Sequence, residues 1–427
     1  MTDSNYVLLA MPDMNGYLRG KALRRSAFEA AAEHGTVMTD LLLGLDPVDA
    51  PISDYEGFGI RSGAGDLVVR PEVESVHELT WRPGWSVCLA TPSWRDGSPC
   101  DLAVREVLRH ALDGIRELGY ETRAAFEYEV RIWDGEGRPL STGISYSIVE
   151  AGRYHALVST LEPALDALGM ELSAIHTEAG PGLLELNLAA QEGLRAADEA
   201  ALVKLAVKGV AETLGLRASF LAKTAPGEEG SSGHVHLSLW KEGTNAFAPD
   251  DGEGLSTPAV QAVAGMVEHL AGASLLLNPT VNSYKRLVPG WFAPVNASWG
   301  IENRSAALRV ISSSAQQDRC RIECRRPGAD ANPYLALAAL VVATGEGLRS
   351  GNEPPPPVVG DAYAREDLPA LPGSLESALA AFRADGKLRA GLGERFSDYF
   401  AVSREWELKA WRDTVSEWER ERYERVV

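Results

Sequence analysis

Four short stretches of this chain carry polar or ionisable side chains at every second position, with apolar residues between them. They read FEYEV at 126–130, LLELNL at 183–188, GHVHLSL at 233–239 and RIECR at 321–325. Residues two apart in a β-strand face the same side, so each stretch is predicted to be a strand with one apolar and one polar face. Several such strands in one chain require a sheet whose apolar face is covered by other elements.

Taken one at a time, these patterns have ordinary explanations. Glu127 and Glu129 could form a solvated face, His234 and His236 a structural pair, and the arginines around Glu323 a surface ion network. The apolar residues between them favour another interpretation, in which the polar faces point inward. An inward charge is costly unless it is paired or bound to a metal. Carboxylates with one or two imidazoles suit Mg²⁺ or Mn²⁺ better than structural zinc.

Five arginines form a second group of candidate site residues. They are Arg286, Arg304, Arg309, Arg321 and Arg325. Guanidinium groups stay charged and hold phosphates and carboxylates through paired hydrogen bonds. With divalent metals they indicate phosphoryl transfer from a nucleotide. The sequence has neither GxxxxGK[ST] nor GxGxxG, so a P-loop or Rossmann nucleotide site is not expected.

One loop carries two neighbouring aromatic side chains at a Pro-Gly turn. Residues 284–294 read YKRLVPGWFAP, in which a Pro-Gly turn presents the pair Trp291 and Phe292 after two cations. Loops usually lie on the surface and carry function. The two aromatic side chains are therefore expected either to pack into a core or to line a site.

The pattern of elements predicts an α+β protein. Residues 1–98 are rich in strand-like stretches, and an amphipathic helix begins near Pro99 and stops at Gly119. Later helices are predicted at 153–169, 196–215, 258–276 and 332–350. Residues 351–361 form a Pro-rich loop, and the tail from about 374 is helical and charged. The domain boundary is therefore placed between residues 98 and 99.

Composition limits the partners and the location. Forty-one basic against 60 acidic residues leave a net charge of −19, which argues against nucleic acid and anionic membranes as partners. The negative charge could attract a cationic substrate, or it could serve only to keep the protein soluble. The chain has no uninterrupted apolar run of about 18 residues and no signal-peptide pattern at its start. Its cysteines, Cys88, Cys100, Cys320 and Cys324, are interpreted as buried thiols in a reducing cytoplasm.

Together these motifs resemble the glutamine synthetase family. GHVHLSL, YKRLVPG, NRSAALR, RIECR and ANPYLALAAL occur in family order, after FEYE and EAGPGLLELN, from about residue 120 to 345. DMNGYLRGK is similar to the family's small N-terminal domain. The resemblance implies a β-grasp domain at 1–98 and a catalytic domain at 99–427 built on a curved antiparallel sheet with helices. It also implies a dodecamer of two hexameric rings with active sites between subunits.

The resemblance also implies a reaction and roles for individual residues. ATP phosphorylates the γ-carboxylate of glutamate, an amine attacks the acyl phosphate, and two or three Mg²⁺ or Mn²⁺ ions assist. One metal would be held by Glu129, Glu178 and Glu185, and the other by Glu127, His234 and Glu323. Arg304, Arg309 and Arg321 match phosphate-binding catalytic positions, and His236 and Ser238 lie on the nucleotide side with Arg309 and Arg321. Arg286, Arg325 and Gly230 match the glutamate clamp.

Departures from the family pattern concern the amine and the acid substrate. Phe292 stands where glutamine synthetases have a flap glutamate that binds ammonium and accepts its proton, and Trp291 beside it could contact a protonated amine. Glu229 replaces an asparagine that helps to hold the acid substrate, which leaves open whether glutamate is the only acid used, and Glu229 could instead contact the positive charge of the amine. Tyr146 is a further partner at the amine site, and Asp46 is a candidate for the ammonium-site aspartate.

These departures favour a ligase that joins glutamate to a polyamine, ethanolamine or another primary amine. The alternatives are ammonium-dependent glutamine synthesis, with the aromatic pair as a plug, and a non-catalytic ring-forming relative. The six predicted metal positions are all Glu or His, which argues against the non-catalytic alternative. Glu366 begins the stretch EDLP, where enterobacterial enzymes carry an adenylylated tyrosine, so that control is not expected.

Overall fold

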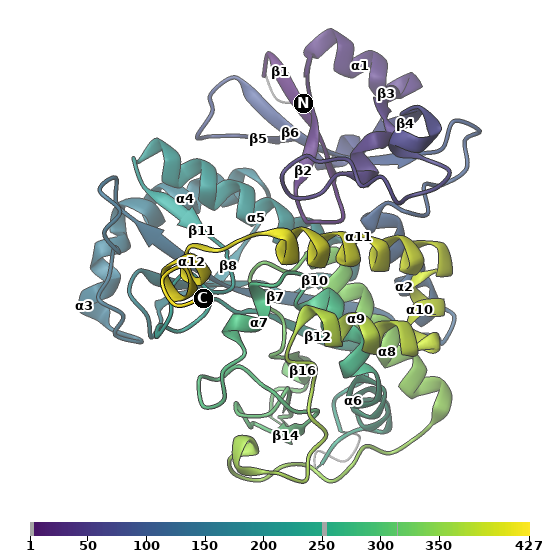
Figure 1. Ribbon diagram of the computed structural model, residues 1–427. Helices are drawn as coiled ribbons and strands as arrows, with labels where there is room; N and C mark the ends of the chain where they lie inside the picture. The colour runs from purple at the N-terminus through teal and green to yellow at the C-terminus, as the bar shows by residue number, and fades with distance from the viewer. Residues whose placement is uncertain (1–3, 250–253, 314) are drawn as a thin grey trace.

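The computed structural model describes residues 4–249, 254–313 and 315–427, and this part of the chain forms two β-sheets with helices around them (Figure 1). The first sheet is N-terminal. Its strands are β1 (Tyr6–Pro12), β2 (Leu18–Arg24), β3 (Thr36–Thr39), β4 (Asp66–Pro71), β5 (His77–Glu78) and β6 (Trp85–Ser93), in the order β2-β1-β6-β4-β3 with β5 paired to β6. Only the β1–β6 pair of this described sheet is parallel. The strand-rich character expected for residues 1–98 is confirmed, because the stretches YVLLAMPD, DLVVRP and WSVCLATP contain β1, β4 and β6.

The second sheet contains the four patterned stretches. Its main strands, from one edge to the other, are β14 (Trp299–Ile301), β15 (Leu308–Ile311), β16 (Arg321–Cys324), β12 (Gly233–Lys241), β7 (Glu121–Trp133), β9 (Leu183–Leu188) and β8 (Leu172–Thr177). The short strands β10 (Gln191–Glu192) and β11 (Arg217–Ser219) pair with β7, and β13 (Thr244–Asn245) pairs with β12. All of these pairs are antiparallel except β14–β15, which is parallel. The expected antiparallel sheet is therefore confirmed apart from this edge.

Helices cover both sheets and form the tail. The α-helices are α1 (Arg25–His34), α2 (Val104–Arg116), α3 (Ile148–Ala151), α4 (His155–Ala167), α5 (Gly193–Thr213), α6 (Thr257–Leu277), α7 (Ser283–Arg286), α8 (Pro333–Ser350), α9 (Leu375–Ala384), α10 (Gly386–Leu392), α11 (Glu394–Asp413) and α12 (Glu417–Tyr423). Short 3₁₀ turns are η1 (Asp40–Gly44), η2 (Gly59–Ser62), η3 (Val73–Ser75), η4 (Gly152–Tyr154), η5 (Gln317–Arg319) and η6 (Ala362–Ala364). The predicted helices are confirmed as α2, α4, α5, α6 and α8, with ends shifted by a few residues, whereas α1 was not expected.

Local sequence explains where the two central helices begin. Ser256 accepts a hydrogen bond from the Ala259 amide at the start of α6, and Asn332 accepts one from Tyr334 at the start of α8. A proline follows each cap, where its missing N–H costs nothing. The side-chain oxygens satisfy amides that have no partner inside the helix.

Helices α6 and α8 cross at glycines. A Cβ on Gly265 would lie 2.1 Å from the Ala343 carbonyl oxygen, so only glycine permits this approach. By length and composition α6 could cross a membrane, but most of it is buried against α8 and α9. It is therefore a core helix of this fold.

A buried ion network joins the first sheet to the helices over the second. Arg105 of α2 is 4% exposed, and its Nε and Nη2 donate to the two carboxylate oxygens of Asp198 at 2.9 and 2.8 Å. Its Nη1 also donates to Glu72 at 3.0 Å and to Thr91 at 2.7 Å. Apolar residues of both regions belong to one continuous core. The predicted domain boundary falls between β6 and α2. Arg105 therefore connects groups that lie before this boundary in the chain, Glu72 and Thr91, with one that lies after it, Asp198.

Candidate active site

The second sheet brings the polar faces of β7, β9, β12 and β16 together. His234 pairs with Glu127 across β12 and β7, and Glu129 pairs with Glu185 across β7 and β9. The apolar positions of β7 point the other way: Phe126, Tyr128 and Val130 are at most 2% exposed. The ammonium of Lys204 on α5 lies 4.5 Å from the ring centre of Tyr128, which places α5 on that apolar side. The inward orientation expected for the polar faces is thus explained by helices that cover the opposite face.

One group of possible metal ligands lies at the centre of the sheet. Ligand atoms of Glu127, His236 and Glu323 all lie within 4.8 Å of one another. His234 Nδ1 is 3.5 Å from Glu127 Oε2 and 3.6 Å from Glu323 Oε1. Both ring nitrogens of His234 are buried without a hydrogen-bond partner. A buried imidazole with free nitrogens beside two carboxylates fits a divalent cation.

A second group lies toward the β8 edge. Ligand atoms of His176, Glu178 and Glu185 also lie within 4.8 Å of one another. Burial and the charge of Glu185 raise the pKa values of Glu129 and Glu178. A cation placed among these carboxylates would relieve that repulsion. The donors again match a hard divalent metal.

His176 was not predicted from the sequence. Its Nε2 is 3.2 Å from Glu185 Oε1 and its Nδ1 is 3.4 Å from Glu178 Oε1. A usable signal was present, because His176 precedes Glu178 by two residues at the end of a strand. The stretch LSAIHT has few of the residues that favour a strand, so the alternation of His176 with Glu178 was not recognised.

The charges of the central group are set by its neighbours. Burial alone would raise the pKa of Glu127, but the adjacent His236 and His234 lower it well below its usual range. Burial opposes ionisation of Glu323 too, yet Arg325 and the two histidines lower its pKa to about 2. Both side chains are therefore carboxylates at neutral pH, as metal ligands must be.

Arginines surround the central group. Arg309 Nη1 donates to Glu323 Oε2 at 3.0 Å, and Arg325 donates to the other oxygen of Glu323. Arg321 Nε donates to His236 Nδ1 at 3.0 Å, which leaves Nε2 of that ring directed at Glu127. Arg304 is exposed at the turn before β15. The sheet thus gathers three of the predicted phosphate and acid contacts around one carboxylate and one imidazole.

Arg286 and Gly230, which the resemblance places together at the glutamate clamp, are adjacent. Arg286 is 3% exposed, and its terminal nitrogens donate to the carbonyls of Arg325 and Arg326 at 3.2 Å. A Cβ on Gly230 would lie 2.5 Å from the Ala222 carbonyl oxygen and 2.6 Å from Arg286 Cγ, so glycine is required there. Ser238 lies farther along β12, where its hydroxyl accepts from Trp240 Nε1 at 3.0 Å.

The aromatic loop is not packed into the core of this chain. Phe292 is 57% exposed and has a left-handed backbone, with φ of 52°. Trp291 is half-buried, and the ammonium of Lys223 lies 4.2 Å from the centre of its ring system. One face of Trp291 is thus already occupied by a cation of the protein itself. Lys223 was not predicted, because it lies 68 residues before Trp291.

The remaining amine-site candidates differ in accessibility. Tyr146 is 66% exposed, and its ring centre is 4.3 Å from that of His176. Burial raises the pKa of Glu229, which is half-buried, and Lys223 opposes that rise. Asp46 is 7% exposed and accepts hydrogen bonds from the amides of Val48 and Ala50 and from an indole, so its carboxylate is used structurally within this chain.

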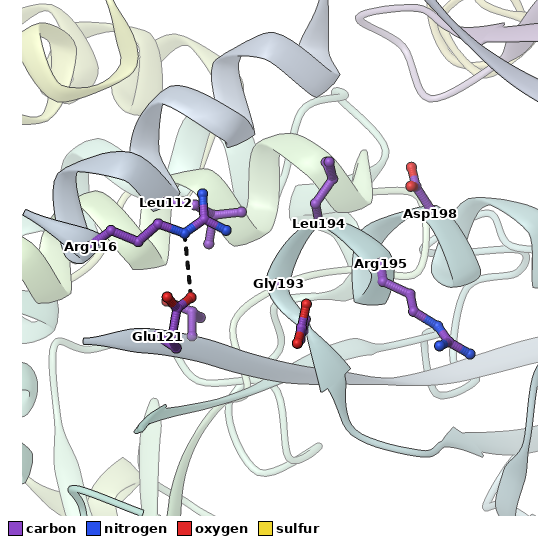
Figure 2. A pocket seen from close by; sticks show the side chains of 9 residues that line it. Leu112, Arg116, Glu121, Gly193, Leu194, Arg195 and Asp198 are labelled. Atoms are coloured by element: carbon purple, nitrogen blue, oxygen red, sulfur yellow. Dashed lines mark hydrogen bonds and ion pairs between the residues drawn. The ribbon is translucent and has the colours of Figure 1, made fainter. Parts of the chain in front are cut away.

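A separate polar cavity lies at the start of β7 and α5 (Figure 2). It measures about 290 Å³ and is lined in part by Arg116, Glu121, Arg195 and Asp198. Arg116 pairs with Glu121 across it, and the carboxylate of Asp198 is held by Arg105. None of the predicted metal or substrate residues lines this cavity.

Fold and site together define a class of protein: an α+β protein whose sheet face gathers carboxylates, imidazoles and guanidinium groups, which are the side chains that bind divalent metals and anions. The profile of the glutamine synthetase catalytic domain matches residues 101–423. The chain belongs to the glutamine synthetase family, as its motifs suggested.

Relatives in this family span almost the whole chain. A glutamate–isopropylamine ligase of Pseudomonas sp is 32% identical over 99% of this chain and 95% of its own length. The γ-glutamylethanolamide synthetase GlnA4 of Streptomyces coelicolor is 33% identical over 99% and 94%. A glutamine synthetase of Thermus thermophilus is 32% identical over 98% and 95%. Among solved structures, a GmaS complex with ADP superposes with a TM-score of 0.88 at 27% identity, covering 98% of this chain and 96% of the other.

Proposed function

We propose that the protein is an ATP-dependent ligase that joins the γ-carboxylate of glutamate to an organic primary amine. The γ-phosphoryl group of ATP passes to a carboxylate oxygen, which yields γ-glutamyl phosphate and ADP. The amine nitrogen then attacks the acyl carbon, phosphate leaves, and the nitrogen loses a proton as the amide forms. The organic amine could be a polyamine, ethanolamine or a small alkylamine.

The observation that carries this proposal is the side chain at position 292. Phe292 has no charge with which to bind ammonium and no group that accepts its proton, and 57% of its surface is exposed and available to an alkyl or aryl group. An exposed phenyl ring gains free energy when it covers carbon rather than ammonium. Two relatives with matching length, the isopropylamine ligase and the ethanolamide synthetase, support an organic amine.

The proposed cofactors are ATP and two or three Mg²⁺ or Mn²⁺ ions. The residues that would hold the metals are Glu127, Glu129, Glu178, Glu185, His234 and Glu323, with His176 and His236 in contact with them. Bound divalent ions would neutralise phosphate charge during transfer. Arg304, Arg309 and Arg321 would meet the phosphates, and Arg286 and Arg325 the glutamate carboxylate.

The location, the oligomeric state and the partners that we propose are those that the family resemblance implies. We infer a cytoplasmic homo-oligomer, a dodecamer of two hexameric rings, whose partners are small molecules rather than nucleic acid or membrane. Glutamine synthesis from ammonium is the second candidate, since glutamine synthetases match at similar identity.

One experiment separates these functions. ADP release is measured with glutamate, ATP and Mg²⁺ against a panel of amines that includes ammonium, and each product is identified by mass spectrometry. We expect at least one organic amine to exceed ammonium by 10-fold or more in kcat/KM, about 1.4 kcal/mol of selectivity. Equal or faster turnover with ammonium would support glutamine synthesis, and the absence of ADP release with every amine would support a non-catalytic role. A Glu178→Ala variant controls for contaminating ATPase.

A further inference from the structure

Arg131 is a buried arginine that the reaction as described does not use. It follows Glu129 by two residues on β7 and points to the same face of the sheet. Its side chain is 1% exposed. Burying a guanidinium group costs free energy unless hydrogen-bond acceptors surround it, so the fold must supply acceptors to Arg131.

Those contacts reach two different loops. Arg131 Nη1 donates to the Pro181 carbonyl at 2.8 Å and to the Glu228 carboxylate at 2.6 Å. Its Nη2 donates to the Glu229 carbonyl at 2.6 Å. A planar guanidinium group can serve three acceptors in fixed directions, which the single ammonium of lysine cannot reproduce.

The first loop is the turn between two predicted metal ligands, Glu178 and Glu185. A Cβ on Gly180 would lie 3.1 Å from Arg131 Nη2, and one on Gly182 would lie 2.5 Å from the Ile132 carbonyl oxygen. Glycines therefore allow the turn to lie directly against β7 and the arginine. The position of Glu178 depends on this packing, because its side chain belongs to the same turn.

The second loop, residues 223–230, contacts the loop that carries the aromatic pair. The ammonium of Lys223 donates to the carbonyl of Glu228 and lies 4.2 Å from the ring centre of Trp291. Asn282, just before α7, holds the Lys223 backbone through two hydrogen bonds of 2.8 and 2.9 Å. The segment 223–230 is thus attached to Arg131 at one end and to the Trp291 loop at the other.

We propose that Arg131 is a positioning residue which, through the segment 223–230, couples the metal-binding turn at Glu178 to the loop that carries Trp291 and Phe292. This inference rests on the proposed function for the metal-binding role of Glu178 and for the identity of the nitrogen donor. Displacing either loop then disturbs the other, so metal affinity and amine selection depend on one another.

The test compares Arg131→Met, Lys223→Met and the double variant. Mn²⁺ affinity is measured by electron paramagnetic resonance without substrates, and KM and kcat are measured with whichever nitrogen donor the wild type prefers. We expect Arg131→Met to weaken Mn²⁺ binding about 10- to 100-fold, as loss of a residue that orients metal ligands does. It should also raise KM for the nitrogen donor, and the double variant should show less than the product of the two single effects.

Matched variants keep the test decisive. Arg131→Lys keeps the charge but loses the fork, so it should resemble Arg131→Met in both readouts. If Arg131→Met does not fold, Glu228→Gln removes one charged contact with little change in shape and should shift both readouts in the same direction. Unchanged Mn²⁺ affinity, or independent effects of Arg131 and Lys223 on KM, would overturn the coupling. A wild type that prefers ammonium would overturn the proposed function and leave this test intact.

Discussion

Shortening Phe292 to alanine probes the part of the proposal that sets the substrate. An aromatic side chain buries roughly 150–250 Å² when fully covered. Because 57% of Phe292 is exposed, about 85–140 Å² is available to an amine. At about 25 cal/mol per Å², this area corresponds to an upper limit of about 2–3.5 kcal/mol, or roughly 30- to 400-fold in kcat/KM. A small amine covers only part of the ring, so we expect a loss of about 10-fold or more.

The assay is steady-state ADP release with the preferred amine, with KM for glutamate and ATP measured in parallel. Phe292→Leu retains most of the apolar surface and should lose little, which makes it the matched control. Phe292→Glu restores a carboxylate to the loop and should raise the use of ammonium while it weakens the organic amine. A Phe292→Ala enzyme whose kcat/KM for the amine stays within threefold of wild type would refute the reasoning.

Three further predictions concern the metals, the arginines and the core. Glu178→Ala should abolish ADP release while thermal unfolding shows an intact fold, because the metal loses a carboxylate; near-normal turnover would contradict the assignment. Arg304→Ala should lower kcat by about 10²–10³-fold, whereas Arg325→Gln should mainly raise KM for glutamate; identical effects on both parameters would show that the roles are not divided. Burial lowers the pKa of His269, but the carboxylate of Asp385, 2.8 Å from its Nδ1, raises it above 6.5 overall. The ion pair should therefore stabilise the fold fully below pH 6.5 and less as the pH rises through the raised pKa of His269. Asp385→Asn should lower the free energy of unfolding, measured in urea, by about 1.5–3 kcal/mol at pH 5.5 and by less at pH 8.5. A loss that does not change with pH would show that the charge of His269 does not contribute.

Much of the candidate site could be read from single stretches of sequence. Glu127 and Glu129 alternate with Phe126 and Tyr128, so the strand and its polar face follow from a period of two. Helices α6 and α8 were equally accessible, since each combines a long apolar stretch with a capping residue and a proline. Helix α1 was missed because its short, weakly amphipathic pattern lies among strands.

Contacts between stretches that lie far apart in the chain could not be predicted from the periodicity of each stretch. Periodicity within a strand says which side chains share a face, but the register between strands decides which of them meet. That register places Glu323 opposite His236 on β12 and Arg309 on β15, and brings His176 opposite Glu185. Each pairing depends on loop lengths and on packing over the whole sheet.

The polar and apolar faces of the strands and the main helices follow from the amino-acid sequence alone, and the family resemblance adds the expectation that Phe292 stands where glutamine synthetases have a flap glutamate. Only the folded chain shows that Lys223 covers one face of Trp291 while Phe292 stays exposed, and that Arg131 joins the turn after Glu178 to Glu228. The physical reason is the range of the forces. Backbone geometry and burial impose local periods of two and 3.6 residues, which a single stretch reveals. Hydrogen bonds and ion pairs between loops act over a few ångströms in space, and only the folded chain brings those loops together.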